Sequence, residues 1–177
     1  MLDKLKNEHF VIFDTETTGL MPEAGDEIVE IAAQKIKNDQ IIDEFYSLIK
    51  PNVPMTEGAF LMHGYSDEFL ARNGSPAQEI IPRFYDFSKE AILVGHNILS
   101  FDLSFLNIQS QKLGLPKINN LVIDTLIMSR KLLPGLPNHK LTTLADFFKI
   151  DAAGAHRAQK DVEMNKQIFL NLLKGVN

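Results

Sequence analysis

The sequence predicts a mixed α/β fold in which one five-stranded sheet is flanked by helices. Three strand-type segments follow one another near the N-terminus, and the last two are joined by a short turn. Further along, short apolar runs alternate with amphipathic helical segments. Three antiparallel strands followed by strand–helix units are typical of one mixed sheet covered by helices. Because the 177 residues contain no linker-like stretch or repeat, we expect a single domain, residues 1–177.

Strand signals dominate the N-terminal part. The run Phe10–Phe13 is apolar throughout, which is typical of a buried strand. The segment Thr15–Gly25 is polar and contains glycine and proline, so we expect a loop there. Residues 27–37 and 40–49 have strand composition, and Asn38-Asp39 between them predicts the turn of an antiparallel hairpin.

Helical signals begin after the prolines of residues 51–54. Short helices are predicted over residues 57–70, interrupted near Gly64. Ser75 is a typical N-cap residue and Pro76 a typical first helical residue, so the next helix is expected to start there and to end near Lys89.

The C-terminal half alternates strands and helices. Short apolar runs predict strands at residues 92–94 and 121–123. The spacing of apolar residues predicts helices over 100–113, 124–133, 140–148 and 155–173. Gly114 and the proline two residues later are a common stop signal for the first of these helices.

Composition excludes several classes of protein. The chain has no cysteine, so disulfides, thiolate catalysis and cysteine zinc sites are excluded. No apolar run approaches the ~20 residues of a membrane span, and the polar segment Met1–His9 is not a signal peptide. We therefore expect a cytoplasmic protein without a membrane partner. The net charge of −5 argues against binding nucleic acid mainly through a basic face, although bound metal ions could still hold a phosphate.

Acidic residues fall where the predicted elements end. Asp14 and Glu16 follow the first apolar run, Asp102 lies in the first turn of a predicted helix, and Asp161 follows His156 near the start of the last helix. Carboxylates that meet at one place repel one another unless cations neutralise them. Carboxylate oxygens suit Mg²⁺ or Mn²⁺, and two such ions can hold the attacking and leaving oxygens of a phosphodiester.

Each acid also has an ordinary explanation. The stretch that starts at Asp14 begins like a calcium-binding loop, but its twelfth position is Gly25, where a bidentate glutamate would be required. Asp102 alone could be a helix N-terminal charge, and Asp161 alone part of a solvated helix face. We interpret three further acids as surface charge on the second strand: Asp26, Glu27 and Glu30. Glu30 precedes an apolar stretch, so partial burial is an alternative for it.

Three sequence motifs, taken together, resemble a known family. They are Phe13–Leu20 (FDTETTGL), Gly95-His96-Asn97 with Phe101-Asp102, and His156–Ala158 with Asp161. They are similar to the motifs of the DnaQ-like (DEDDh) 3′–5′ exonucleases, the family of the proofreading epsilon subunit of bacterial DNA polymerase III. The resemblance covers residues 8–173 and implies a ribonuclease H-like sheet. One difference is that three residues, instead of two, separate His-Asn from Phe-Asp.

The resemblance implies a catalytic role for each matching residue. Asp14 would bridge two divalent metal ions, Mg²⁺ or Mn²⁺, and Glu16 and Asp161 would complete the site near the attacking water. Asp102 would act on the second ion, partly through water. His156 would be the general base, since an ordinary imidazole, with a pKa of about 6.5, can accept a proton near neutral pH.

The resemblance also implies how a 3′ end is recognised. Backbone N–H groups at Glu16 and Thr17 would contact the terminal 3′-OH, and Leu20 would press against the last bases. His63 would lie near the terminal nucleotide, although a structural histidine is an equal alternative. The basic residues near His156, Arg157 and Lys160, are better explained as solvated helix charge than as phosphate ligands.

The function expected from these motifs is 3′–5′ exonucleolytic removal of 5′-mononucleotides from DNA, in proofreading or repair. Single-stranded or mismatched 3′ ends would be the main partners. An RNA-trimming enzyme of the oligoribonuclease or ribonuclease T type is one alternative, and an inactive nucleic-acid-binding module is another. All four acids are present, which disfavours the inactive module. The chain ends soon after its last predicted helix, without the tail by which epsilon holds its polymerase, so a stable polymerase partner is not expected from that signal.

Overall fold

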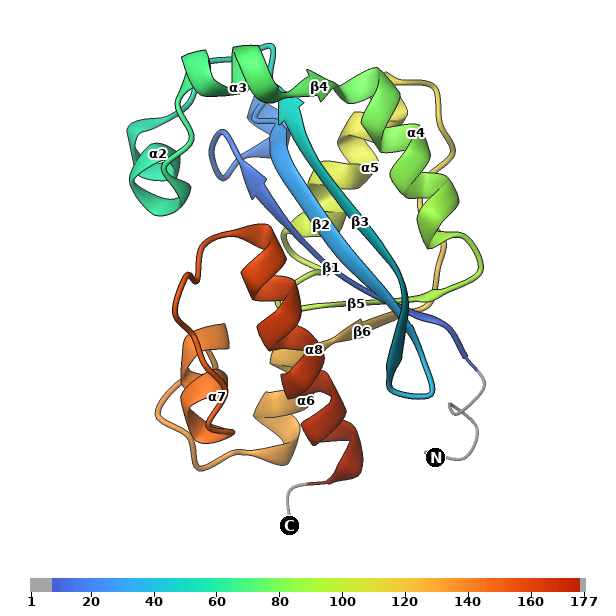
Figure 1. The fold of residues 1–177 in the computed structure, drawn as a ribbon, viewed down its shortest axis with the longest axis vertical. Coiled ribbons are helices and arrows are strands. Elements are labelled where there is room, and N and C mark those ends of the chain that lie inside the picture. The colour runs from blue at the N-terminus through green and yellow to red at the C-terminus, as the bar shows by residue number, and fades with distance from the viewer. Residues whose placement is uncertain (1–7, 176–177) are drawn as a thin grey trace.

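A computed structural model describes residues 8–175, and its centre is a six-stranded sheet of order β4-β3-β2-β1-β5-β6 (Figure 1). Strands β1 (Phe10–Thr17), β2 (Ile28–Lys37) and β3 (Gln40–Lys50) are antiparallel neighbours. Strand β5 (Ile92–Gly95) runs parallel to β1, and β6 (Val122–Asp124) runs parallel to β5. The mixed α/β sheet expected from the sequence is confirmed.

The sheet has one strand more than the five predicted. Strand β4 (Ser75–Pro76) pairs in parallel with the end of β3. Ser75 is therefore not a helix N-cap, and Pro76 precedes helix α4 (Ala77–Ser88) instead of opening it. The physical reason lies at Gly74, where a Cβ atom would stand 2.6 Å from the backbone nitrogen of Lys50. This close approach brings the chain alongside β3, and a two-residue pairing leaves no pattern in the sequence.

The hairpin between β2 and β3 follows the prediction. Asn38 and Asp39 have φ angles of 51° and 63°, and the flanking residues Lys37 and Gln40 are paired. Two consecutive positive φ angles match the right-handed twist of the two strands, and Asn and Asp tolerate them. Gly114, predicted as a helix stop signal, also has a positive φ and follows the end of α5 (Asp102–Lys112).

Helices cover both faces of the sheet, so β1 is buried on both sides. Val11 and Phe13 pack in one core with residues of α4 and α5, whereas Phe10 and Ile12 pack in a second core with residues of α8 (Ala158–Lys174). This explains why the strand is continuously apolar. The remaining helices of the described residues are α2 (Glu57–His63), α3 (Asp67–Asn73), α6 (Thr125–Leu132) and α7 (Leu141–Phe147), with a 3₁₀ turn at Pro22–Ala24.

The first strand is longer than predicted. It continues to Thr17, so Asp14 and Glu16 lie on β1 and not in a loop behind it. In the pairing of β1 with β2, Asp14 lies opposite Ala32 and Glu16 lies opposite Glu30. Because side chains alternate along a strand, Asp14 and Glu16 project to the same face while Thr15 projects to the other. The polar residues at the end of β1, which suggested a loop, therefore lie at the edge of the candidate site.

Within the described residues, no helix is both long and apolar enough to cross a membrane. Residues 1–7, most of the segment from which we predicted the absence of a signal peptide, lie outside the described part of the chain.

Candidate active site

Three of the predicted acids meet beside the end of β1. Carboxylate oxygens of Asp14, Glu16 and Asp161 all lie within 4.8 Å of one another. Two of these residues come from the same face of β1, and the third from the first turn of α8, which packs along that strand. We call these three residues the carboxylate cluster. It joins residues almost 150 positions apart in the chain, as the motifs predicted.

Asp102 adjoins this cluster but is held differently. Its Oδ1 atom accepts hydrogen bonds from the backbone N–H of Thr15 at 3.0 Å and from the Thr15 hydroxyl at 2.7 Å. The side chain is buried at the start of α5. Thr15 lies between Asp14 and Glu16 on β1, and among the neighbouring charges the charge of Asp102 has the largest effect in raising the pKa of Asp14. The fourth acid thus lies at the cluster, with one of its oxygens committed to β1.

The electrostatics of the cluster are unfavourable without cations. Burial, followed by the charges of Asp102 and Asp161, raises the pKa of Asp14 well above its usual value. Burial, followed by the charge of Asp161, raises the pKa of Glu16 to about 8. Burial also raises the pKa of Asp102 and that of Asp161 to about 6 each. Desolvation and like charges both favour the protonated acids, so the ionisation of all four carboxyl groups at once near neutral pH requires a positive partner.

The donor set fits a divalent cation. Asp161 Oδ2 accepts the backbone N–H of His156 at 3.2 Å, whereas its Oδ1 atom is buried and has no hydrogen-bond partner in the described residues. A buried carboxylate oxygen without a partner is costly unless something absent from the protein chain satisfies it. Hard carboxylate oxygens are the ligands that Mg²⁺ and Mn²⁺ prefer. The cluster could therefore hold a metal ion.

His156 lies at the entrance of the cluster, just before α8. Its φ of 68° is in the left-handed region, and its backbone N–H binds Asp161. The side chain is exposed and lines two grooves that meet at the cluster. An exposed imidazole beside half-buried and buried carboxylates is placed to exchange protons with a substrate water.

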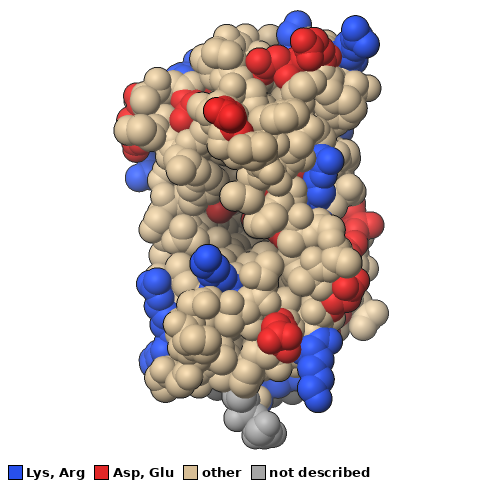
Figure 2. Space-filling model, turned by 90° about the vertical axis from the view of Figure 1, so that its left-hand side faces the viewer, with Lys and Arg blue, Asp and Glu red and all other residues tan. Residues whose placement is uncertain are grey.

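A largely apolar groove of about 690 Å³ opens on the Glu16 side of the cluster. Figure 2 shows a hollow on the face that carries α2 and α7, with acidic side chains visible at its floor. All three predicted substrate-binding residues, Thr17, Leu20 and His63, line this groove. The side chain of Leu20 is 79% exposed, so it is free to contact a ligand in the groove. Phe101 of the second motif, for which the sequence predicted no separate role, lines the groove too.

The loop that presents Leu20 is fixed by Asp26. The carboxylate of Asp26 accepts the backbone N–H of Met21 at 2.9 Å and the hydroxyl of Thr18 at 3.2 Å. A side chain at Gly19 would collide with that carboxylate, so Asp26 would have to move away and lose these hydrogen bonds. The interpretation of Asp26 as charge on the second strand was wrong, because the residue precedes β2 and its half-buried carboxylate holds the loop.

His63 is a structural residue as well as part of the groove wall. Its Nδ1 atom accepts the backbone N–H of Tyr65 at 3.1 Å, so its Nε2 atom donates to the carbonyl oxygen of Thr17 at 3.2 Å. Burial lowers the pKa of His63, which keeps the ring neutral. With both nitrogens committed, the ring can offer a nucleotide only its face or edge.

Glu30 is a functional candidate that the sequence did not reveal: we expected strand-surface charge, with partial burial as the alternative, and the residue is fully buried. Its side chain is 1% exposed, and Glu30 is the β2 partner of Glu16. One carboxylate oxygen accepts the Tyr65 hydroxyl at 2.7 Å, and the other accepts the backbone N–H of Ala158 at 3.0 Å. Glu30 thereby ties β2 to the first residue of α8, directly after His156-Arg157. Glu27 was misread in the same way, since it is buried and accepts the backbone N–H of Asn52 at 2.7 Å.

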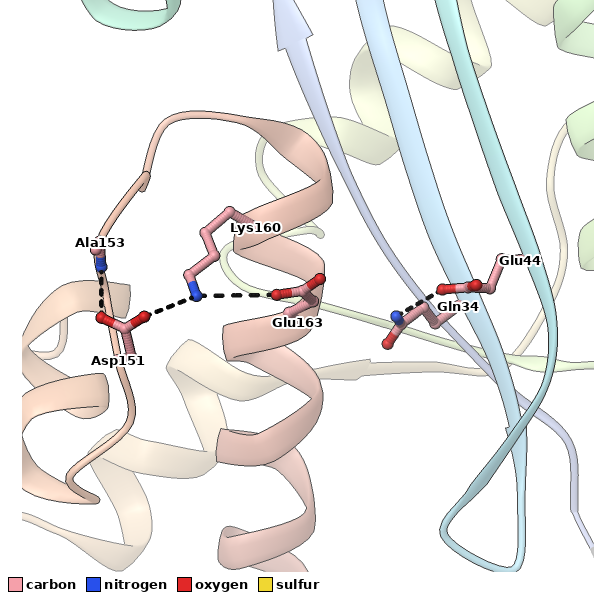
Figure 3. Close-up of polar contacts among 6 residues, drawn as sticks. All are labelled: Gln34, Glu44, Asp151, Ala153, Lys160 and Glu163. Carbon is pink, nitrogen blue, oxygen red and sulfur yellow. Dashed lines mark hydrogen bonds and ion pairs between the residues drawn. The ribbon is translucent and has the colours of Figure 1, made fainter.

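The two basic residues after His156 have different partners. Lys160 pairs with Asp151 at 3.4 Å and with Glu163 at 3.8 Å, as Figure 3 shows. The guanidinium of Arg157 lies over the ring of Tyr65, 4.2 Å from its centre. The solvated charge predicted for Lys160 agrees with its exposed ion pairs.

The extra residue of the second motif is absorbed by a tight loop between β5 and α5. Asn97 has a φ of 62°, and its backbone N–H donates to Asp124 Oδ1 at 3.1 Å. Leu99 donates to the other oxygen of Asp124 at 3.3 Å. His96 Nδ1 lies 3.1 Å from the Thr125 hydroxyl. The insertion therefore leaves Asp102 at the start of α5, where the motif predicts it.

Comparisons with known proteins agree with this geometry. A family model described as Exonuclease (RNase_T) matches residues 11–169. The DNA polymerase III PolC-type of Caldanaerobacter subterraneus subsp. tengcongensis is 42% identical over 165 residues, 93% of this chain and 12% of that protein. The DNA polymerase III PolC-type of Halalkalibacterium halodurans is 40% identical over 171 residues, 96% of this chain and 12% of that protein. The chain thus spans about an eighth of the length of these relatives.

Solved structures share the fold. E. coli exonuclease I in complex with a dA16 oligonucleotide has a TM-score of 0.83 at 20% identity, covering 94% of this chain and 40% of that chain. Exonuclease X in complex with 5′ overhanging duplex DNA has a TM-score of 0.73 at 24% identity, and the match covers 93% of this chain and 91% of that chain. The sequence motifs, the carboxylate cluster and a family match that spans β1 to α8 lead to one conclusion: this chain belongs to the DnaQ-like exonuclease family.

Proposed function

We propose that this chain is a metal-dependent 3′–5′ exonuclease that removes 5′-mononucleotides from DNA, preferring single-stranded or mismatched 3′ ends. One observation supports it above all. The carboxylate cluster, with its unpartnered Asp161 oxygen, opens directly onto a groove large enough for a nucleotide. A phosphodiester bound there would have its phosphate at the acids and its terminal nucleoside against Leu20 and Phe101.

In this proposal, Asp14, Glu16 and Asp161 are the residues that would hold divalent cations, with Asp102 contributing through the oxygen that Thr15 leaves free. Two Mg²⁺ or Mn²⁺ ions bound at these carboxylates would neutralise phosphate charge and make a nearby water more acidic. The unfavourable burial of the acids supports this role, because a cation relieves both their desolvation and their repulsion.

His156 is the proposed general base. Its imidazole accepts a proton from the attacking water while the new oxygen–phosphorus bond forms and the bond to the 3′ oxygen of the preceding nucleotide breaks. The leaving oxygen then takes a proton from solvent. The backbone contact from His156 to Asp161 supports the assignment, because it fixes the loop next to the acids. Glu30 is proposed as a positioning residue for the same loop, through Ala158.

Recognition of the 3′ end is assigned to the end of β1. The register of β1 and β2 shifts between Glu16 and Thr17, and this irregularity interrupts the ladder beside the groove. Backbone groups at this point are proposed to meet the terminal 3′-OH, while the exposed Leu20 packs against the last base. His63 holds the Thr17 carbonyl and so shapes the floor under the terminal sugar.

DNA is the proposed substrate, and a DNA polymerase is the proposed source of the ends that the chain acts on. The names of the PolC-type relatives and the oligonucleotide complexes of the fold relatives support this choice. We propose that residues 1–177 act as one exonuclease domain, as the continuous family match favours.

The test uses the purified chain with Mg²⁺ or Mn²⁺ and substrates labelled at the 5′ or the 3′ end. The substrates are single-stranded DNA, matched duplex DNA, 3′-mismatched duplex DNA and short RNA. We expect 5′-mononucleotides from the 3′ end, fastest from single-stranded and mismatched DNA. Shortening from the 5′ end, or faster hydrolysis of RNA than of DNA, would overturn the proposal. The Asp14→Asn variant controls for contaminating nucleases.

A further inference from the structure

A second groove, of about 460 Å³, borders the carboxylate cluster on the Asp161 side. His156 lines this groove as well as the apolar groove on the Glu16 side, so the two grooves meet at the candidate active site. The wall of the second groove comes from α6, from the connection between α6 and α7, and from the start of α7. We call it the α6–α7 groove.

The α6–α7 groove differs from the first one in charge. Its lining includes Arg130 and Lys140, and its single acid is Asp161 of the cluster. Neither cation forms an ion pair within residues 8–175, in contrast to Lys160, which has two acidic partners. In a protein with a net charge of −5, two unpaired cations on one groove wall indicate an anionic ligand.

Arg130 and Lys140 are exposed, but the backbone that presents Lys140 is held in place by local hydrogen bonds. Asn138 accepts the backbone N–H of Lys140 at 3.1 Å and the hydroxyl of Thr143 at 2.6 Å, which fixes the chain before α7. The Nδ1 atom of His139, another lining residue, is buried and has no partner in the described residues. Because this nitrogen is closed off from solvent, the His139 ring is part of the groove wall, and the ligand contacts are left to the two cations.

The direction of the substrate strand follows from the chemistry. The scissile phosphate joins the terminal nucleotide to the nucleotide on its 5′ side. If the terminal nucleoside occupies the apolar groove and the scissile phosphate meets the cluster, the rest of the strand must leave on the other side. The α6–α7 groove opens there, next to Asp161 and His156.

We therefore propose that the α6–α7 groove binds the DNA backbone on the 5′ side of the scissile bond, through Arg130 and Lys140. The inference rests on the proposed function. It explains how an acidic protein holds a polyanion next to its own carboxylates, since the contacts are local and need no basic face. Each phosphate contact on a single strand contributes about 0.7 to the salt dependence of log K.

The test compares two substrates. One is a single-stranded oligonucleotide of about ten nucleotides, and the other is the p-nitrophenyl ester of thymidine 5′-monophosphate, which has a terminal nucleotide but no strand on its 5′ side. Arg130→Gln and Lys140→Gln should each lower kcat/KM for the oligonucleotide roughly 3- to 10-fold, as expected for one charge-assisted contact. The effect on the ester should stay below about twofold. The matched control is Lys131→Gln, an exposed cation on the same helix outside the groove.

The outcomes are distinguishable. A loss on the oligonucleotide alone, with a salt slope smaller by about 0.7 for each variant, supports the inference. Equal losses on both substrates, or losses no larger than those of Lys131→Gln, overturn it. A wild-type chain that hydrolyses neither substrate refutes the proposed function itself. Melting temperatures of the variants identify any that fail to fold.

Discussion

Replacing Glu16 with glutamine should stabilise the metal-free protein while abolishing its hydrolysis. In the folded chain, burial and then the charge of Asp161 raise the pKa of Glu16 from its usual 4.5 to about 8. Between these two values the folded state holds a proton that the unfolded state has released. The free energy of unfolding of the metal-free protein therefore falls as pH rises from about 4.5 to about 8. Glutamine does not titrate, so residue 16 of the variant should no longer contribute to this decrease in the free energy of unfolding.

The size of the effect follows from the same pKa values. One pKa unit corresponds to about 1.4 kcal/mol, so the shift of Glu16 sets a ceiling of about 5 kcal/mol. The site is open to solvent and counter-ions through the groove, and their screening leaves about 1–3 kcal/mol. For a chain of this length, each kcal/mol moves the melting temperature by about 2–4 °C.

The assay is thermal or urea unfolding of wild type and Glu16→Gln in chelator, at about pH 5 and about pH 8, then with Mg²⁺ or Mn²⁺. We expect the variant to exceed wild type at the higher pH and to approach it at the lower. Added metal should stabilise wild type more than the variant, because ligands that bind the folded state raise its stability. Glu79→Gln, an exposed acid on α4, is the matched control. A Glu16→Gln variant that is less stable than wild type at the higher pH would refute the reasoning.

Three further predictions concern single residues. His156→Ala should lower turnover by roughly 10²–10⁴-fold while metal binding persists, and loss of metal in calorimetry would instead identify His156 as a ligand. Opening a terminal base pair costs a few kcal/mol, so mismatched 3′ ends should be cut faster than matched ones. Leu20→Ala should slow cutting of matched ends more than of single strands, and equal slowing would show that Leu20 does not support the opened end. Glu30→Ala should lower kcat roughly tenfold or more with little change in KM, since it releases the start of α8, and Glu30→Gln should restore part of it. Glu44→Ala, an exposed acid of the same hairpin, is the control, and an equal effect of both would contradict a positioning role.

Local patterns were enough to predict the frame of the site. The apolar run of β1 indicated a buried strand, and its alternate residues do pack against helices on both faces. Asn38-Asp39 and Gly114 marked a turn and a helix end because few residues tolerate positive φ. The carboxylate cluster was predictable because its three members lie in motifs whose residue types and spacing are specific.

Contacts between distant residues could not be read from the sequence. Glu30 looked like strand-surface charge because its partners, Tyr65 and Ala158, lie 35 and 128 positions away. Strand β4 depends on the close approach of Gly74 to Lys50, which no pattern within two residues can indicate. The end of β1 was read as loop because its polar side chains face a functional site and not solvent. Polar residues in a sequence look the same whether their side chains face a functional site or solvent.

The most direct test of the central claim is a calorimetric titration of Mn²⁺ into wild type, Asp161→Asn and the control Glu79→Gln, with hydrolysis of single-stranded DNA measured on the same samples. If Asp14, Glu16 and Asp161 form the metal site on which hydrolysis depends, wild type and the control bind Mn²⁺ and cut DNA. Asp161→Asn should then bind at least about tenfold more weakly and lose hydrolysis, because it removes an anionic oxygen donor. Equal Mn²⁺ affinity in all three proteins, or DNA hydrolysis by Asp161→Asn at the wild-type rate, would contradict the account.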